Sequence, residues 1–266
     1  MDEASLERPT CSCGNAVGVQ FERIAAFVDD VRGAAAISEL REILVEISAE
    51  LGFSHFALAH HVDLRRASTP AIRIHNYPAE LEQYHDDQQL GARDPVHRAC
   101  QRTAIGFAWS ELPDMIQLTP RDRRVLDAAA SRGIEEGFTV PAHVPAELSG
   151  SCSFATARGE RLEANNLAMA QLVGAFAFQA ARQFLKALTP NNAPSPQVSN
   201  RERECLVWIA RGKTDWEIGT ILGISVETVR QYVKHARTRY DVVSRSQLVA
   251  HALLAGTISF PEIAGR

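Results

Sequence analysis

Residues 189–197 have the sequence TPNNAPSPQ, which suits neither a helix nor a central strand. Its three prolines lack the backbone N–H that both elements need, and its two asparagines favour turns. We therefore interpret 189–197 as a linker between two domains of the 266-residue chain. The larger domain would span 21–188 after a mobile N-terminal tail, 1–20, and the smaller domain would span 198–266.

The composition is that of a globular protein, with 45% hydrophobic and 23% charged residues. The most apolar segment, Leu167 to Phe178, contains Gln171 and is shorter than the roughly 18 residues of a membrane helix. Residues 1–10 are polar and lack the apolar core of a secretion signal. We expect a cytoplasmic protein without a membrane segment.

Charge is distributed unevenly along the chain. The net charge is −4, yet the residues from Pro196 onward hold ten Lys and Arg against seven Asp and Glu, a net charge of +3. The preceding part therefore carries −7. Positive charge gathered in one terminal domain is typical of a module that meets nucleic-acid phosphates.

The five cysteines are odd in number and contain no C-x-x-C pair. Such a set favours reduced thiols over a disulfide framework. Cys11 and Cys13 form a C-x-C pair, but no two further ligands lie at a suitable spacing for a metal ion. We expect neither a metal nor a cofactor.

The pattern of the larger domain predicts helices on both faces of an antiparallel sheet. Apolar residues recur every three or four positions from Ile37 to Leu51, the period of an amphipathic helix, and Gly52 would end it. A similar stripe from Met169 to Phe184 predicts a long closing helix, which either forms a dimer surface or packs within the monomer. The expected strands are 53–62, 71–75, 137–143 and 149–156, and two further helices are expected over 94–103 and 121–132. This order indicates an α+β fold, with an α/β/α sandwich as its larger domain.

Two capping boxes mark helix starts in the smaller domain. Ser199 with Glu202, and Thr214 with Glu217, each pair a capping hydroxyl with an acidic residue three positions later. Gly223 would end the second helix, and a third would follow over 226–239, capped by Ser225. Two short helices, a tight turn and a longer helix predict a small all-α helix-turn-helix domain.

The third helix has one apolar face and one polar, basic face. Val229, Val233 and Ala236 are spaced to face the core, so the other side chains are free to read base edges or hold phosphates. A merely solvated face is the alternative, but the two capped helices before it favour DNA recognition. The candidate DNA-binding residues are Lys213, Thr214, Val226, Glu227, Thr228, Arg230, Gln231, Lys234 and Arg237.

Residues 199–253 resemble the LuxR-type DNA-binding domain, whose GKT-x-x-EI and IS-x-x-TV patterns are both present. Tyr232 and His235 depart from the histidine and asparagine that are common at those positions. The resemblance implies that a last helix, 245–253, pairs two copies of the chain on an inverted-repeat site in double-stranded DNA. RNA polymerase would be a further partner. Three hallmark positions are matched, by Glu202, Leu206 and Gly212.

The larger domain fits neither a receiver nor an enzyme. A phosphoacceptor receiver needs alternating strands and helices, which this pattern lacks. Ser151, Cys152 and His143 are candidate catalytic groups, but no motif such as G-x-S-x-G surrounds them. We therefore expect a sensor without catalytic residues; an enzyme would instead turn over a bound ligand.

Residues 76–109 resemble the pocket region of the acyl-homoserine-lactone-binding domain of quorum-sensing regulators, a resemblance that extends over about 21–187. It implies a ligand-responsive transcription regulator whose small-molecule signal lies in an apolar cavity. Burial leaves the lactone's one N–H and two carbonyl groups in need of partners. The matched positions are Tyr77, Asp94, Pro95, Trp109 and Gly137.

The resemblance also assigns roles. Asp94 would accept from the amide N–H, and Tyr77 and Ser153 would donate to the acyl carbonyl. Trp109 would pack on the ring, and Leu126 and Ala129 would line the acyl chain. The alternative is that Tyr77 and Trp109 are core aromatics and Asp94 is a helix cap.

Two departures concern the ligand. Leu81 stands where the family has the tryptophan that donates to the lactone carbonyl, and His85 replaces a common tyrosine. An unpaired buried carbonyl costs about 1–3 kcal/mol, or about ten- to hundredfold in affinity. Either another donor such as His85 replaces the tryptophan, or the ligand is not a standard lactone, or the regulator needs no ligand. Gly106 also stands where proline is common.

Overall fold

The computed structural model describes residues 13–65, 70–144, 147–188 and 196–264. The chain forms two compact units, the first ending at Thr189 and the second beginning at Pro190. Most of the predicted linker and residues 1–12 of the predicted tail lie outside the described residues. Residues 13–20, which we assigned to the tail, instead begin helix α1, Cys13–Gly33. The later part of this helix is buried through Ile24 and Phe27, and packing of that kind sustains adjoining helical turns.

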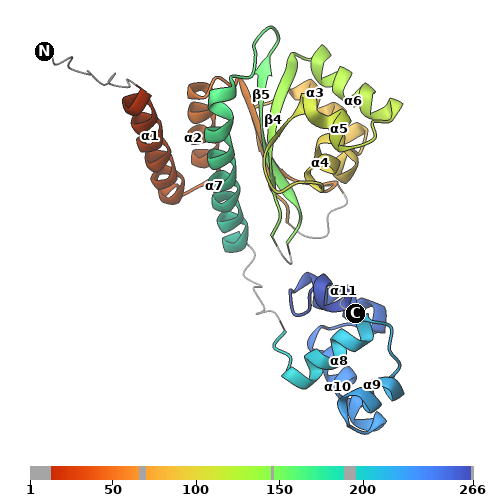
Figure 1. Cartoon of the computed structure of the whole chain (residues 1–266). Helices are drawn as coiled ribbons and strands as arrows, with labels where there is room; N and C mark the ends of the chain where they lie inside the picture. Colours follow the sequence, from red (N-terminus) through yellow and green to blue (C-terminus); the bar gives the residue numbers. More distant parts are fainter. Residues whose placement is uncertain (1–12, 66–69, 145–146, 189–195, 265–266) are drawn as a thin grey trace, which may run out of the picture. The chain divides into compact units, whose positions relative to one another are not determined.

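The first unit is built on a five-stranded antiparallel sheet with the strand order β2-β1-β5-β4-β3 (Figure 1). The four strands predicted from the sequence are confirmed, with bounds that differ by a few residues. Strand β3 has two residues, too few for an alternating pattern to reveal. The strands are β1 His55–His60, β2 Arg73–His75, β3 Phe107–Ala108, β4 Ile134–Ala142 and β5 Gly150–Ala157.

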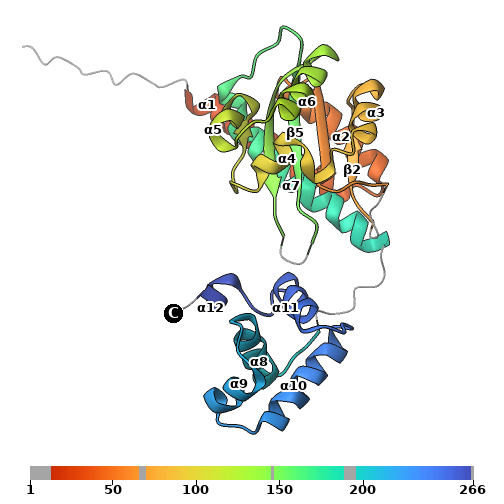
Figure 2. The ribbon, with the colours of Figure 1, turned by 90° about the vertical axis from the view of Figure 1, so that its right-hand side faces the viewer.

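Helices cover both faces of this sheet, which confirms the predicted α/β/α sandwich. One layer contains α1, α2 and α7, and the other contains α3 to α6 (Figure 1). Figure 2 views the sheet from the side of α3 to α6. The remaining bounds are α2 Ile37–Glu50, α3 Ala79–Asp87, α4 Pro95–Cys100, α5 Leu112–Met115, α6 Pro120–Ser131 and α7 Ala164–Leu188, with 3-10 turns at Gly91–Arg93 and Trp109–Glu111.

Large and small side chains alternate along the central strands. Phe56 and Leu58 of β1 pack in the core that α1, α2 and α7 close. Ala57 and Ala59 point to the opposite face, where Ala57 pairs with Ser153 of β5. Because these side chains are small, the sheet leaves space beneath α3 to α6.

The apolar stripe of α7 lies mostly within its own domain. Met169, Val173 and Ala180 are buried in the core shared with the sheet. Phe176 is 37% exposed. The buried positions of the stripe therefore pack within the monomer, which was the alternative to a dimer surface.

The second unit is all-α, as predicted. Ser199 Oγ accepts from the N–H of Glu202, while Ser199 N donates to Glu202 Oε2 at 2.6 Å, so the capping box forms. Gly223 ends α9 with a φ of +66°, a backbone conformation that glycine adopts without strain. The helices are α8 Asn200–Ala210, α9 Asp215–Leu222, α10 Val226–Arg239, α11 Arg245–Leu254 and α12 Phe260–Ala264.

No helix in the described ranges is long and apolar enough to cross a membrane. Within those ranges, no three His, Cys, Asp or Glu side chains gather as a metal site requires. Cys11 lies outside the described residues, so the C-x-C interpretation stays a prediction.

Candidate ligand pocket and DNA-binding surface

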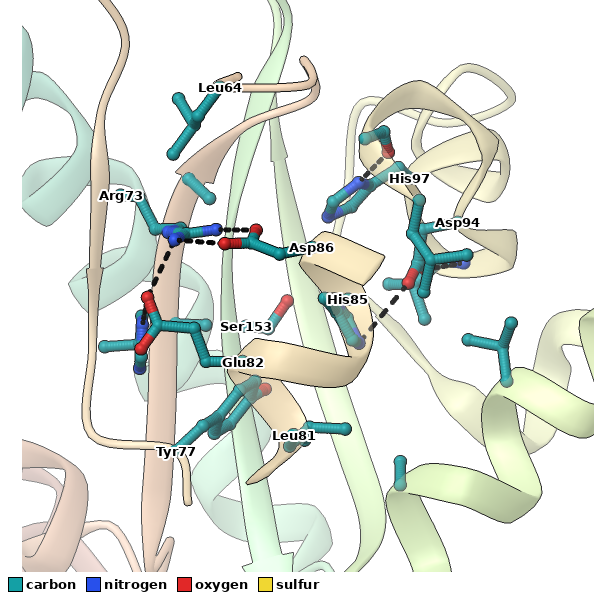
Figure 3. A pocket seen from close by; sticks show the side chains of 18 of the residues that line it. Leu64, Arg73, Tyr77, Leu81, Glu82, His85, Asp86, Asp94, His97 and Ser153 are labelled. Atoms are coloured by element: carbon teal, nitrogen blue, oxygen red, sulfur yellow. Dashed lines mark hydrogen bonds and ion pairs between the residues drawn. The ribbon is translucent and has the colours of Figure 1, made fainter. Parts of the chain in front are cut away.

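The first unit contains a pocket between the small-residue face of the sheet and the helices α3 and α6 (Figure 3). The cavity measures about 120 Å³, several times the roughly 10–15 Å³ that one water molecule requires. All of the predicted ligand-binding residues except Pro95 line it. The lining ones are Tyr77, Leu81, His85, Asp94, Trp109, Leu126, Ala129 and Ser153.

Pro95 does not line the pocket. It is the first residue of α4, where its fixed φ suits the helix start and its missing N–H is not needed. Its neighbours on either side, Asp94 and Val96, do line the pocket. The predicted ligand-binding role of Pro95 stays a prediction.

Asp94 is both a helix cap and a pocket residue. Its Oδ1 accepts a 2.8 Å hydrogen bond from the backbone N–H of Val96, and the residue is 4% exposed. Its Oδ2 lies 3.9 Å from His85 Nε2, which is beyond hydrogen-bond distance. Burial lowers the pKa of His85, although Asp94 opposes the shift, so the imidazole is neutral near pH 7.

Hydroxyl groups in the pocket are held by neighbours on the sheet. Trp109 Nε1 donates to Thr139 Oγ1 at 2.9 Å, and this oxygen lies 2.8 Å from Ser153 Oγ. The indole N–H is therefore engaged with the protein, which leaves the ring face for packing. Burial, and then the Asp94 carboxylate, raise the pKa of Tyr77, so its hydroxyl stays a donor. Thr139 was not anticipated from the sequence.

Leu81 makes the pocket apolar at the position where a donor was expected. It is 2% exposed and packs with Ala129, Ile134 and Ala155. His85 lies one turn further along α3 and faces the same cavity (Figure 3). Among the α3 residues that line the pocket, the side-chain nitrogen donor is thus His85, one turn from the leucine.

An ion-pair cluster in the lining was missed by sequence reasoning. Arg73 of β2 contacts two acidic residues of α3: its Nη1 lies 2.6 Å from Asp86 Oδ1 and its Nη2 lies 2.7 Å from Glu82 Oε1. His75 Nε2 lies 3.4 Å from the same Glu82 oxygen. The α3 segment has no apolar repeat that would have predicted a helix, so nothing in the sequence brought these residues together.

The three residues considered for catalysis, Ser151, Cys152 and His143, do not pair with one another. Ser151 Oγ lies 2.9 Å from His61 Nε2, whereas His143 Nε2 contacts the carbonyl of Cys100 at 2.7 Å. Cys152 belongs to the core on the opposite face of the sheet, where burial raises its thiol pKa. His61 stacks on His97 with ring centroids 4.0 Å apart.

Helix α10 presents the polar face that the sequence predicted. Val229 and Ala236 are buried and Val233 is half-buried. Arg230 Nε lies 3.9 Å from Asp215 Oδ2 and its Nη1 lies 3.5 Å from Glu227 Oε2, so it is only loosely held. Glu227, Arg230, Gln231 and Lys234 are exposed, and Val226, Thr228 and Arg237 are half-buried.

Lys213 and Thr214 lie at the start of α9. Thr214 caps the helix through Glu217, and Lys213 Nζ lies 3.0 Å from Glu217 Oε1. Arg245, which we did not predict, donates to the carbonyl of Lys213 at 2.6 Å and pairs with Asp215. It therefore links the start of α11 to the helix-turn-helix.

Family models match both units. Residues 36–182 match the autoinducer binding domain, and 196–252 match the bacterial regulatory proteins of the luxR family. The quorum sensing-dependent regulator RpaR of Rhodopseudomonas palustris is 31% identical over 89% of this chain and 95% of its own length. The transcriptional activator LuxR of Aliivibrio fischeri is 23% identical over 88% and 94%, respectively.

Solved structures share the fold. The crystal structure of Escherichia coli SdiA matches with a TM-score of 0.62 at 20% identity, covering 90% of this chain and 98% of SdiA. A structure of SdiA in complex with octanoyl-rac-glycerol matches with a TM-score of 0.60 at 21% identity, covering 97% and 99%.

A pocketed α/β/α domain joined to a helix-turn-helix domain defines a DNA-binding regulator with a small-molecule site. The matched relatives are regulators of transcription and not enzymes. The chain belongs to the LuxR family of quorum-sensing transcriptional regulators, with an autoinducer binding domain before its helix-turn-helix.

Proposed function

We propose that this regulator binds an acyl-homoserine lactone, or a closely related neutral acylated signal, in the pocket of its first unit. The observation that carries the proposal is the buried carboxylate of Asp94. Its Oδ1 accepts from the backbone N–H of Val96, whereas its Oδ2, 3.9 Å from His85 Nε2, accepts no hydrogen bond from the described residues. A buried acceptor of this kind requires a donor. An amide N–H supplies one and makes a charge-assisted bond.

The neighbouring side chains complement the rest of such a head group. The Tyr77 hydroxyl, kept protonated by burial, donates to the acyl carbonyl, and Ser153 lies on the pocket floor to assist it. The Trp109 ring packs against the lactone. A neutral His85 has one N–H to donate, and we propose that it supplies the donor that Leu81 lacks.

A non-lactone ligand is the second candidate, and Leu81 is the observation that favours it. SdiA, whose fold is similar, has been solved in complex with octanoyl-rac-glycerol, an acylated molecule without a lactone ring. A glycerol head group offers hydroxyl donors to Asp94. It has no lactone carbonyl, so it needs no hydrogen-bond donor at position 81. A regulator that needs no ligand is a third candidate; it would be a soluble dimer that binds DNA equally well without any addition.

We further propose that the protein acts in the cytoplasm as a homodimer on an inverted-repeat promoter site, where it meets RNA polymerase. Helix α11 and the exposed part of α7 at Phe176 are the candidate dimer contacts. Ligand burial stabilises the folded dimer by mass action, and the stabilised dimer occupies DNA.

Native mass spectrometry of the protein expressed with acyl-homoserine lactones or monoacylglycerols tests this proposal. Asp94→Asn is the informative variant because its side-chain oxygen can still cap α4 while its NH₂ replaces the acceptor. We expect the wild type to retain one ligand and Asp94→Asn to lose it at an unchanged melting temperature. Asp94→Ala should lose both the ligand and about 1 kcal/mol of stability with the cap. A folded dimer that retains no acylated molecule would contradict the proposal.

A further inference from the structure

The pocket has a second polar side, away from the Asp94 carboxylate. Figure 3 shows Arg73, Glu82 and Asp86 on one side of the cavity and Asp94 on the other. These three side chains are 29%, 37% and 27% exposed, so they form the rim and not the deepest part of the site. A ligand held at Asp94 and long enough to cross the cavity therefore ends against this charged rim.

Acceptors outnumber donors at the rim. Arg73 directs both terminal nitrogens to carboxylates, with Nη1 on Asp86 Oδ1 and Nη2 shared between Glu82 Oε1 and Asp86 Oδ2. The hydrogen bond and ion pairs to Glu82 all go to Oε1, so Oε2 has no partner among the described residues. A methyl group placed there would make no polar contact, whereas a hydroxyl would donate to a charged acceptor.

The charge of the whole lining points the same way. Among the described residues that line the pocket, Arg73 is the one arginine or lysine, against the carboxylates of Asp63, Glu82, Asp86 and Asp94. Arg65, outside the lining, lies 3.8 Å from Asp86 Oδ2. A ligand that ends in a carboxylate would add a further negative charge to this set and be repelled. The lining therefore disfavours free fatty acids and acids formed by opening a lactone.

We propose, on the basis of the function proposed above, that the signal is a neutral molecule whose acyl group carries a hydrogen-bond-donating hydroxyl at the end remote from the amide. Glu82 Oε2 accepts from this hydroxyl, and Arg73 fixes the orientation of the Glu82 and Asp86 carboxylates. These three residues set the specificity for the far end of the ligand. Asp94 and Tyr77 hold the near end.

The test is a binding titration with matched lactones that differ only at the end of the acyl chain, in short, medium and long forms. Each length is offered with a terminal methyl, hydroxyl or carboxylate. We expect the wild type to bind the best-fitting hydroxyl form about tenfold more tightly than its methyl partner, the scale of one hydrogen bond to a charged group. The carboxylate form should not bind measurably.

Two variants and a control locate the preference. Glu82→Met removes the unpartnered acceptor, and Arg73→Leu/Glu82→Leu/Asp86→Leu makes the rim apolar. Both should bind the methyl form at least as well as the hydroxyl form. Glu80→Met is the matched control, because Glu80 is exposed on the same helix and does not line the pocket. It should keep the wild-type preference, and thermal melting confirms that each variant is folded.

The outcomes separate this proposal from the function on which it rests. A wild type that binds the methyl form as tightly as the hydroxyl form at every length overturns the rim proposal and leaves lactone sensing in place. A hydroxyl preference that persists in both rim variants also overturns it. If no lactone binds the wild type or any variant, lactone sensing falls and the rim proposal falls with it.

Discussion

A Cβ atom added to Gly137 would lie 2.4 Å from Cε2 of Trp109, closer than real Cβ contacts come. Glycine at this position of β4 therefore makes room for the indole. The same indole donates to Thr139, two residues further along the strand. Strand β4 thus sets both the position of the indole ring over the sheet and its orientation in the pocket.

Gly137→Ala should displace Trp109 and weaken ligand binding. We expect a loss of about 1–3 kcal/mol in the free energy of unfolding, the usual cost of overpacking a filled site, measured by chemical denaturation. Gly33→Ala is the control, because a Cβ atom there would meet nothing within 4 Å. Equal stability of the two variants would mean that the ring moves aside without strain.

Leu81→Trp should raise the affinity for a plain acyl-homoserine lactone about tenfold, because the indole N–H adds a second donor for the ring carbonyl beside the one that we assign to His85. Leu81→Phe adds a ring without an N–H and is the matched control. Binding is measured by titration with one lactone for all three proteins. Equal gains in both variants would assign the effect to bulk and not to the hydrogen bond.

Arg230→Ala and Lys234→Ala should each weaken DNA binding about ten- to hundredfold in a gel shift on an inverted-repeat site. If Arg230 contacts a base, its loss also reduces the difference in affinity between the specific site and a scrambled duplex. If Lys234 contacts phosphate, its loss lowers both affinities alike and flattens the salt dependence. Arg161→Ala, an exposed arginine of the first unit, removes the same charge as a control. Unchanged affinity in both α10 variants would remove this helix from the interface.

Acidification should destabilise the protein through His61. Burial, with the nearby His97, His143 and His60, lowers its pKa from 6.5 to about 2. Between these values the unfolded chain binds a proton that the folded chain does not, so stability is complete above about pH 6.5 and declines as pH falls. The slope from one such group is at most about 1.4 kcal/mol per pH unit. His61→Gln should make the decline shallower in denaturation curves taken from pH 7 toward pH 5, and His251→Gln, on an exposed position of α11, should not.

The helix-turn-helix was predictable because its signals are local. The capping pairs Ser199–Glu202 and Thr214–Glu217 form as the sequence predicts, since each joins residues only three positions apart. The core strands were equally accessible, because alternation between Phe56 and Ala57 is a property of the strand itself. Their side chains needed no distant partner to reveal the pattern.

The pocket was only partly predictable. Tyr77 and Trp109 could be placed by resemblance, but the Arg73–Asp86 pair depends on the approach of β2 to α3, and neither element's sequence encodes that distance. Thr139 and His61 were missed for the same reason, since their partners lie 30 and 90 positions away in the chain. Helix α1 was missed although Ile24, Phe27 and Val31 are buried along it. Pro95 lies outside the pocket lining, although its neighbour Asp94 belongs to it.

The alternation along β1 and β5 has an evolutionary consequence. Phe56, Leu58 and Phe154 maintain the core on one face, while Ala57, Ala59 and Ser153 shape the cavity on the other. Because neighbouring positions of one strand serve these separate purposes, a substitution that changes which signal is recognised need not weaken the fold. Proteins that inherit this sheet can therefore change which signals they bind through single substitutions of small side chains, while the fold stays the same.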